Sequence, residues 1–465
     1  MIALADVPTH FPADRLALVH GDQRWTWGEL DRRSAAWAAW LCQRGVVADD
    51  LVAFAMPNGP EFIALSFGIY RAGATPAPIS GKLPGFERDA ILATMRPQVF
   101  VGDHDEPGDT PDGNAIAPIP HIAASWKACT SGGSTGRPKV IVDGRPAGFA
   151  PGTEFIGIPE GRVVLVPGPL YHNASFSAAV FALFRGNTVV TMPRFDAAEA
   201  LALIAAEHVA WSIMVPTMLH RLWKLPQALR DSFDLSRWKM VVHTAAPMAP
   251  WLKHAWIDWL GADHIWEVYG ATEGLVRCWI GGREWLDRPG SVGKPIGGGA
   301  LRVADAEGHE VAVGAEGEVF AMPASGAGST YRYIGAERRA SVDGWESVGD
   351  IGHVDADGYL YLADRRTDLI ISGGVNIWPA EVEAAILRHP SVHSCAVIGL
   401  VHEDLGQSVH AVIETDNDGF TVEQLGAFLA DYLARPKQPR SIAIQHSPVR
   451  DDAGKFRKPA AAPIT

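Results

Sequence analysis

The sequence predicts a mixed α/β protein, with a large N-terminal body of parallel, αβ-layered subdomains, a β-rich part, and a small, mobile C-terminal α+β domain. Its 465 residues, 47% hydrophobic and 20% charged, suffice for two or three globular domains. Short apolar runs alternate with helix-like stretches as far as Gly281. After Asp368 a new unit begins, which divides the chain into residues 1–366 and 367–465.

The first helix is predicted over Trp25–Arg44, because apolar and small residues recur there at helical spacing (Leu30, Ser34, Trp37 and Leu41) and Gly45 supplies a stop. Two short apolar runs follow, Leu51–Ala55 and Val99–Val101, and a helix-like stretch lies between them at Glu61–Arg71. Such alternation is typical of a largely parallel sheet with helices on its faces.

The alternation continues through four further apolar runs, each bounded by turn formers or a helix: Val163–Val166, Thr188–Met192, Ala210–Val215 and Lys239–His243. From Gly281 onward, short alternating runs such as Gly317–Ala321 and Gly358–Leu362 indicate antiparallel β-structure. The last unit is predicted to contain a Gly-rich turn, then helix Pro379–Arg388, strands near Ser394–Leu400 and Val409–Glu414, and helix Val422–Leu433.

The charge balance excludes several classes of partner. Forty Lys and Arg against 53 Asp and Glu give a formal charge of −13, which disfavours general binding to nucleic acids or anionic membranes. The four cysteines lack metal-ligand spacing and are expected to be buried thiols in a reducing cytoplasm: Cys42, Cys129, Cys278 and Cys395. Neither a secretion signal nor a membrane-spanning run is recognisable, so a cytoplasmic protein without a membrane span is expected.

The most informative stretch is a ten-residue loop rich in glycine and hydroxyl groups: Thr130, Ser131, Gly132, Gly133, Ser134, Thr135, Gly136, Arg137, Pro138 and Lys139. Glycines allow backbone N–H groups to approach phosphate oxygens, hydroxyls add donors, and Lys139 adds a charge. A Walker A loop would lead into a helix, whereas the β-prone residues Val140–Val142 follow here. The stretch predicts a phosphate-binding loop of another kind.

This loop resembles the signature of the acyl- and aryl-CoA ligase, adenylation-domain and luciferase superfamily, whose members activate carboxylates with ATP. Further stretches resemble that family's motifs in the family's order: Tyr269–Glu273, Gly349–Asp350 with Tyr361 and Asp364–Arg365, Ser372–Glu381, and Gly454–Lys455. The resemblance implies that a carboxylate attacks the α-phosphorus of ATP, giving an acyl-adenylate and pyrophosphate, and that a thiol then displaces AMP. Positioning and charge neutralisation are the main tasks of such a site.

The resemblance also implies a role for each motif. The loop from Thr130 to Lys139 would hold the β- and γ-phosphates, Thr272 would contact the α-phosphate, and Glu273 would help to hold Mg²⁺. Asp350 would accept hydrogen bonds from the ribose, within a nucleotide site that also includes Tyr361 and Arg365. The adenine would be bordered by Ala246, Pro247, Tyr269 and Gly270.

Lys455 is the residue expected to stabilise adenylate formation, carried into the site by the small C-terminal domain. The hinge is expected at Arg365–Asp368, although the family usually carries Asp or Lys where this chain has Thr367. After rotation, the turn at Gly373 and Gly374 would let the thiol of CoA approach closely. An excess of basic residues from Arg435 to Lys458 suggests a site for the CoA nucleotide, with a solvated surface as the alternative.

The acid itself is only outlined by the sequence. The acyl pocket is expected to include His172, and Asn173 stands where amino-acid-activating relatives carry an Asp, which disfavours a cationic substrate. Because the pocket segments show no obvious Arg, a second substrate carboxylate is also disfavoured. We therefore expect an acid–CoA ligase for a hydrophobic cyclic, aromatic or steroid-like acid. A stand-alone enzyme that loads a carrier protein, a non-catalytic adenylate sensor, a luciferase-like oxygenase and a homodimer remain open.

Overall fold

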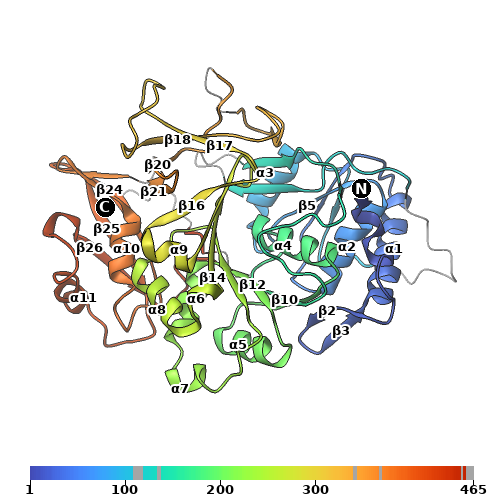
Figure 1. Ribbon diagram of the computed structural model, residues 1–465, viewed down its shortest axis with the longest axis horizontal. Helices are drawn as coiled ribbons and strands as arrows, with labels where there is room; N and C mark the ends of the chain where they lie inside the picture. The colour runs from blue at the N-terminus through green and yellow to red at the C-terminus, as the bar shows by residue number, and fades with distance from the viewer. Residues whose placement is uncertain (108–118, 133–137, 339–342, 366–368, 452–453, 457–465) are drawn as a thin grey trace.

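The computed structural model describes residues 1–107, 119–132, 138–338, 343–365, 369–451 and 454–456, and it confirms the mixed α/β architecture (Figure 1). In this described part, the largest sheet has 13 strands. Their order across the sheet is β17 (Ala300–Ala304), β18 (Gly317–Met322), β20 (Asp350–Val354), β21 (Leu360–Arg365), β16 (Ser291–Ile296), β15 (Arg277–Gly281), β14 (Ile265–Gly270), β13 (Met240–His243), β12 (Trp211–Met214), β10 (Val163–Val166), β11 (Thr188–Thr191), β2 (Leu16–His20) and β3 (Gln23–Thr26).

The strands from β14 through β13, β12, β10 and β11 to β2 are parallel, and those from β14 to β17 are antiparallel. Val164 and Val166 belong to one hydrophobic core and Leu165 to another, because successive strand residues face opposite sides of a sheet. The first core includes helices α1 (Trp27–Gln43), α2 (Pro60–Arg71) and α4 (Asn173–Phe184), and the second includes α5 (Ala197–Ala206), α6 (Pro216–Lys224) and α8 (Pro250–Leu260). This layering explains the nearly continuous apolar runs of the parallel strands.

Smaller sheets complete the body. Strands β4 (Leu51–Phe54), β5 (Thr75–Pro78) and β6 (Val99–Val101) are parallel and share a core with helix α3 (Gly85–Met95). Strands β7 (Ala128–Gly132), β8 (Pro138–Asp143) and β19 (Tyr331–Ile334) are antiparallel, as are β1 (Ile2–Ala3) and β9 (Gly148–Phe149). The short elements are η1 (Leu4–Thr9), α7 (Gln227–Arg230), η2 (Ala262–His264) and α9 (Gly282–Asp287).

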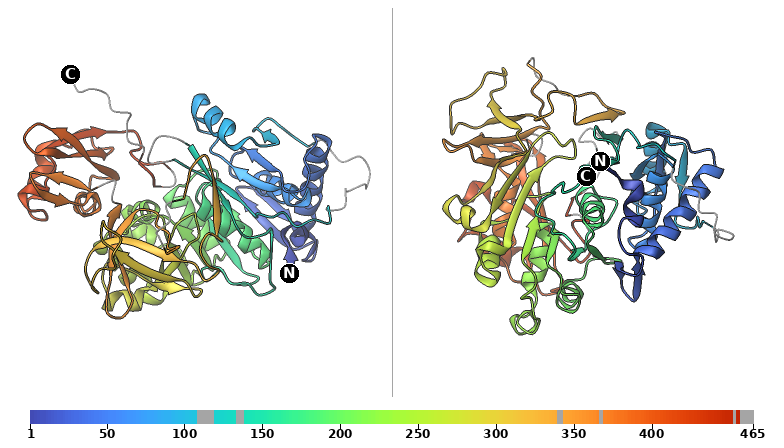
Figure 2. Two further views of the ribbon diagram at one scale, coloured as in Figure 1. Left: turned by 90° about the horizontal axis from the view of Figure 1, so that it is seen from above. Right: turned by 45° about the vertical axis from the view of Figure 1, so that its right-hand side comes forward.

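The C-terminal unit has its own sheet and its own core. The sheet contains β22 (Ile370–Ser372), β23 (Val375–Ile377), β24 (Ser394–His402), β25 (Gly406–Glu414) and β26 (Ser441–Gln445), accompanied by α10 (Pro379–Ile386), α11 (Val422–Leu429) and η3 (Arg435–Lys437). The buried members of this core all lie between Ile370 and Leu433. Figure 2 shows the unit as a separate lobe at the end of the molecule away from the N-terminus. The expected boundary at 366/367 falls outside the described residues and stays a prediction.

Element ends differ from the predictions by a few residues. The first helix begins at Trp27 because Trp25 belongs to β3, and Thr26 caps the helix through a reciprocal pair of hydrogen bonds with Glu29. Cys129, Cys278 and Cys395 are buried, whereas Cys42 is only partly buried. Within the described residues, no helix is long and apolar enough to cross a membrane.

Candidate active site

The predicted phosphate loop joins two antiparallel strands. Strand β7 carries Thr130, Ser131 and Gly132, and β8 carries Lys139, with Ser131 opposite Lys139 in the register. A strand–turn–strand unit agrees with the expectation that this is not a Walker A loop. The predicted residues Gly133, Ser134, Thr135 and Gly136 lie outside the described residues.

Glu273 and Lys139 meet beside this hairpin. The Lys139 ammonium donates to Glu273 Oε1 at 3.1 Å, and the Tyr333 hydroxyl donates to the same oxygen at 2.6 Å. Burial, reinforced by the neighbouring carboxylate of Glu273, raises the pKa of Tyr333 well above its ordinary value, so the hydroxyl keeps its proton. Tyr333 thereby orients a carboxylate whose side chain is only 7% exposed.

The Glu273 carboxylate is suited to a hard divalent cation that also takes phosphate oxygens and water. Among the described residues, no group of three or more His, Cys, Asp or Glu side chains forms a metal cluster. Within this described part of the chain, protein side chains alone therefore do not form a complete metal-binding site. The donor set fits Mg²⁺ brought in with a nucleotide, since Mg²⁺ in such sites is held by one or two carboxylates plus substrate phosphates.

The predicted nucleotide residues lie around the carboxyl ends of β13 and β14. The Tyr269 hydroxyl donates to Asp350 Oδ2 at 2.6 Å, which brings the Tyr269–Glu273 and Gly349–Asp350 motifs together. Thr272 follows β14 in the turn that leads to Glu273. Ala246 and Pro247 follow β13, directly after Ala245, whose φ of +75° is the left-handed conformation that favours glycine.

Two predicted nucleotide residues are placed on β21. Tyr361 stacks on His353, with ring centres 4.8 Å apart, and its hydroxyl lies 3.4 Å from Asp355 Oδ2. The structure thus groups Tyr361 with these residues rather than with Asp350. Arg365 is the register partner of Asp350 across β20 and β21, which keeps that pair of motifs adjacent.

Lys455 belongs to a turn that docks on the beginning of α6. Gly454, with φ of +76°, packs so closely that a Cβ there would lie 3.2 Å from Thr217 Oγ1 and 3.5 Å from Val215 Cγ2. Burial raises the pKa of the Cys129 thiol in β7, and the charges of Lys127 and Lys455 act in the opposite direction. The C-terminal lysine is therefore placed against the N-terminal body, within electrostatic reach of the phosphate-loop strand.

The C-terminal unit is held in this position by contacts to main-chain carbonyls in and just after α10. Side chains of α6 and α8 make them: His220 ring nitrogens lie 3.2 Å from the oxygens of Leu387 and His393, Lys224 donates to His389, and Trp251 donates to Ala384. Burial, with repulsion from Lys224, lowers the pKa of His220 to about 4. The Lys224 ammonium lies near the C-terminus of α10, where the negative end of the helix dipole favours a cation.

Gly373 and Gly374 form the turn between β22 and β23, with φ of +57° and +81°. The basic residues expected near CoA are partly used inside the C-terminal unit: Lys437 pairs with Glu381 at 2.6 Å, and Arg450 pairs with Glu383 at 2.6 Å. These ion pairs lie within the C-terminal unit, and a site for the CoA nucleotide at this cluster stays a prediction. Arg457 and Lys458 lie outside the described residues.

The predicted acyl segment leads into α4. His172 is the N-cap residue of this helix, and its ring centre lies 4.3 Å from that of Tyr171. Asn173 accepts a hydrogen bond from the buried Lys127 ammonium, which also donates to Ser177 Oγ at 3.0 Å. A cation thus stands beside the position where a substrate ammonium would need an anion, which agrees with the expectation that amino acids are disfavoured.

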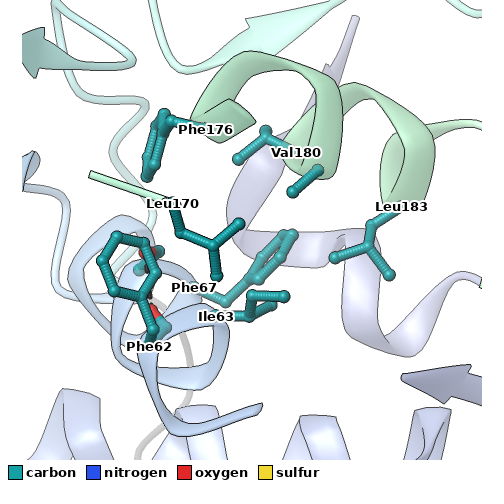
Figure 3. Close-up of a pocket in the computed structure, with 9 residues that line it drawn as sticks. Phe62, Ile63, Phe67, Leu170, Phe176, Val180 and Leu183 are labelled. Atoms are coloured by element: carbon teal, nitrogen blue, oxygen red, sulfur yellow. Dashed lines mark hydrogen bonds between the residues drawn. The ribbon is translucent and has the colours of Figure 1, made fainter. Parts of the chain in front are cut away.

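A small apolar cavity, with a volume of about 10 Å³, lies behind this segment, between α2 and α4 (Figure 3). Its lining is Phe62, Ile63, Ser66, Phe67, Leu170, Phe176, Ala179, Val180 and Leu183. The Ser66 hydroxyl donates to the Phe62 carbonyl at 2.8 Å, so the one hydroxyl side chain in this lining is satisfied within its own helix. Leu170 and Phe176 flank His172 and Asn173, which gives the acyl segment an apolar support.

Sequence reasoning missed three residues of this region: Tyr333, Lys127 and Arg277. Lys127 directly precedes the phosphate-loop strand, and Arg277 lies four residues after Glu273, so proximity to a motif was the available signal. Tyr333 is remote from every motif and reaches Glu273 only because β19 pairs with β8. The expectation that the pocket segments lack an arginine stays a prediction, although β15 pairs Arg277 with Gly270 in the register.

Comparison with known proteins agrees with this geometry. The chain matches the model of the AMP-binding enzyme family at residues 4–127 and 128–328, and that of the AMP-binding enzyme C-terminal domain at residues 381–455. It is 28% identical to the long-chain-fatty-acid–CoA ligase of Mycobacterium tuberculosis (94% of this chain, 92% of the relative). It is 30% identical to a feruloyl-CoA synthase of an Amycolatopsis species (95% and 94%).

Among solved structures, o-succinylbenzoate CoA synthetase from Bacillus subtilis, in complex with its acyl-adenylate intermediate, has the same fold. Its TM-score is 0.79 at 23% sequence identity, and the match covers 98% of this chain and 97% of that chain.

Proposed function

The chain belongs to the AMP-binding enzyme family, and from that premise we propose that it is an ATP-dependent acid–CoA ligase. The proposed reaction joins a carboxylate to the α-phosphorus of ATP with release of pyrophosphate, and CoA then displaces AMP to give the thioester. The observation that carries this proposal is the placement of Lys455 against the body beside β7, where the phosphate loop begins. A cation at that point would stabilise the negative charge of two reacting anions.

In this proposal each motif has its own role in binding the substrates. Lys139 and the loop from Thr130 would hold the outer phosphates, Thr272 the α-phosphate, Asp350 the ribose, and His172 would border the acid. Glu273, oriented by Tyr333, would hold Mg²⁺, which supplies charge neutralisation at the phosphates when bound.

Residues 367–465 would act as the lid, with a hinge at Arg365–Asp368. The contacts of His220, Lys224 and Trp251 would then stabilise the adenylate-forming position of the lid. Rotation of this lid would move Lys455 away from the site and bring the Gly373–Gly374 turn to it, where the CoA thiol would approach.

The surroundings of the acyl segment support an acid with a cyclic or aromatic body. Phe155 stacks on Phe181 with ring centres 4.4 Å apart, and Phe181 contacts Phe149 at 4.7 Å and Trp126 at 5.4 Å. Lys127 lies over the Trp126 ring, 4.4 Å from its centre. Trp126, Phe149 and Phe181 are buried, so this aromatic wall backs the partly buried Phe155, with a cation at its edge.

The test is a panel of aromatic, cyclic and fatty acids scored for pyrophosphate release from ATP, with CoA, with a phosphopantetheine-loaded carrier protein, and with neither. The proposal expects release with ring-containing acids and thioester formation with CoA. Thioester formation with the carrier protein and not with CoA would show that the carrier protein is the thiol acceptor. Absence of release with every acid, under conditions where ATP binds, would favour the non-catalytic sensor.

A further inference from the structure

Arg277 is a partly buried cation on β15, the strand that follows the Tyr269–Glu273 motif. Its Cα pairs with that of Gly270, and a Cβ on Gly270 would lie 3.2 Å from Arg277 Cγ, so glycine makes room for this side chain. The guanidinium carbon lies 5.3 Å from the centre of the Phe155 ring, at the aromatic wall. The described residues offer the guanidinium neither a hydrogen bond nor an ion pair.

The nearest charges leave Arg277 uncompensated. Arg145 donates two hydrogen bonds to Asp143, at 2.9 and 2.8 Å, and the Lys127 ammonium lies 3.9 Å from the same carboxylate. Burial, followed by repulsion from Arg145, lowers the pKa of Arg277, while the attraction of Asp143 opposes both effects. Three cations therefore share one carboxylate, and both oxygens of that carboxylate already accept hydrogen bonds from Arg145.

This cluster of Lys127, Arg145 and Arg277 extends from the proposed reaction centre into the acyl region. Cys129 in β7 experiences the charges of both Lys127 and Lys455. Lys127 in turn contacts Asn173 and Ser177 of α4 and experiences the charge of Arg277. Arg277 and Lys127 are therefore close enough to repel each other, and Lys127 contacts α4 in the acyl segment.

A partly buried guanidinium that meets no anion among the described residues is available to a ligand, and such groups concentrate at ligand sites. The planar fork of arginine matches a carboxylate, which it binds through two parallel hydrogen bonds. We propose that the activated acid carries a second carboxylate, which Arg277 binds at the end of the acyl pocket away from Lys455. This inference rests on the proposed ligase function and specifies its substrate class as a dicarboxylic acid with an aromatic or cyclic body.

The experiment compares matched acids on the full-length chain: 3-phenylpropanoate against 3-(4-carboxyphenyl)propanoate, and benzoate against terephthalate, with the distal methyl ester of each dicarboxylate as the neutral analogue. The readout is kcat/KM for pyrophosphate release. We expect at least one dicarboxylate to exceed its neutral analogue by about 100-fold, since truncating one partner of a buried charge pair costs that order. In Arg277→Met this preference should disappear, while activity with the monocarboxylates stays within a few-fold.

Three results would overturn the inference. One is a wild-type preference for the monocarboxylates and esters. Another is an equal loss on all acids in Arg277→Met, which would assign the guanidinium to the reacting carboxylate. The third is recovery of the full dicarboxylate preference in Arg277→Met. Absence of pyrophosphate from every acid would instead overturn the ligase function itself, so the two failures are distinguishable.

A second measurement keeps the proposal falsifiable if Arg277→Met turns over poorly. Methionine can keep the packing against Phe155, so removing an unpaired partly buried charge should raise the Tm of the ligand-free protein. Arg145→Met is the matched control, because its guanidinium is paired with Asp143 and its loss should lower the Tm. A lowered Tm in Arg277→Met as well would show that the guanidinium is satisfied within the protein and would contradict the proposal.

Discussion

The hydrogen bond from Tyr333 to Glu273 is expected to control the orientation of the proposed metal-binding carboxylate. The hydroxyl lies 2.6 Å from Glu273 Oε1, and the Glu273 side chain is 7% exposed. A hydrogen bond to a charged group contributes about 1.5–3 kcal/mol. Since about 1.4 kcal/mol corresponds to a factor of ten in an equilibrium constant, Tyr333→Phe should weaken the binding of a cation by this carboxylate by about 10- to 100-fold.

The same substitution should raise the Mg²⁺ concentration needed for half-maximal rate, because Glu273 would be held by Lys139 without the second donor that orients it. The assay is pyrophosphate release measured over a range of Mg²⁺ concentrations. Tyr331→Phe is the matched control: Tyr331 lies on the same strand, and its hydroxyl donates to Glu346 at 2.8 Å. A uniform loss of rate in Tyr333→Phe, with an unchanged Mg²⁺ requirement, would refute the positioning role.

Two further predictions concern stability. Ala245→Gly should raise the free energy of unfolding by about 0.5–1 kcal/mol, because the relief of a left-handed alanine exceeds the entropy cost of glycine; unchanged or reduced stability in urea titration would contradict this. The pKa of His220 is about 4 in the folded protein, against 6.5 for the free side chain. As the pH drops from 6.5 towards 4, the unfolded state therefore binds a proton before the folded state does. The free energy of unfolding falls over this range, by at most about 3 kcal/mol. His220→Gln should therefore flatten the dependence of unfolding free energy on pH over this range, and an unchanged slope would exclude His220 as its source.

The fold was largely readable from the sequence because its strands are buried on both faces. Runs such as Val163–Val166 must be apolar throughout in a parallel sheet covered by helices, and this makes them visible. Element ends were less accurate, since a cap such as Thr26 decides where a helix begins, and apolar spacing does not reveal the cap. The motifs predicted which segments converge, as the contact of Tyr269 with Asp350 illustrates.

The remaining parts of the site depend on pairings between distant segments. Tyr333 reaches Glu273 across 60 positions of the sequence because β19 adds to the phosphate-loop hairpin. Arg277 lies opposite Gly270 because a short connection, residues 271–276, returns β15 along β14. A strand register of this kind is set by tertiary packing. The residues of the motifs therefore do not show which charged side chains from neighbouring segments lie beside them.

The central claim, that Lys455 is carried by a mobile lid to form the adenylate, is tested most directly by separating the two half-reactions in Lys455→Ala. Lys437→Ala is the control, because that lysine belongs to the same unit and is paired with Glu381. The account predicts that Lys455→Ala abolishes pyrophosphate release from acid and ATP but forms thioester from supplied acyl-adenylate and CoA at nearly the wild-type rate. Equal loss in both half-reactions, or normal pyrophosphate release, would contradict it.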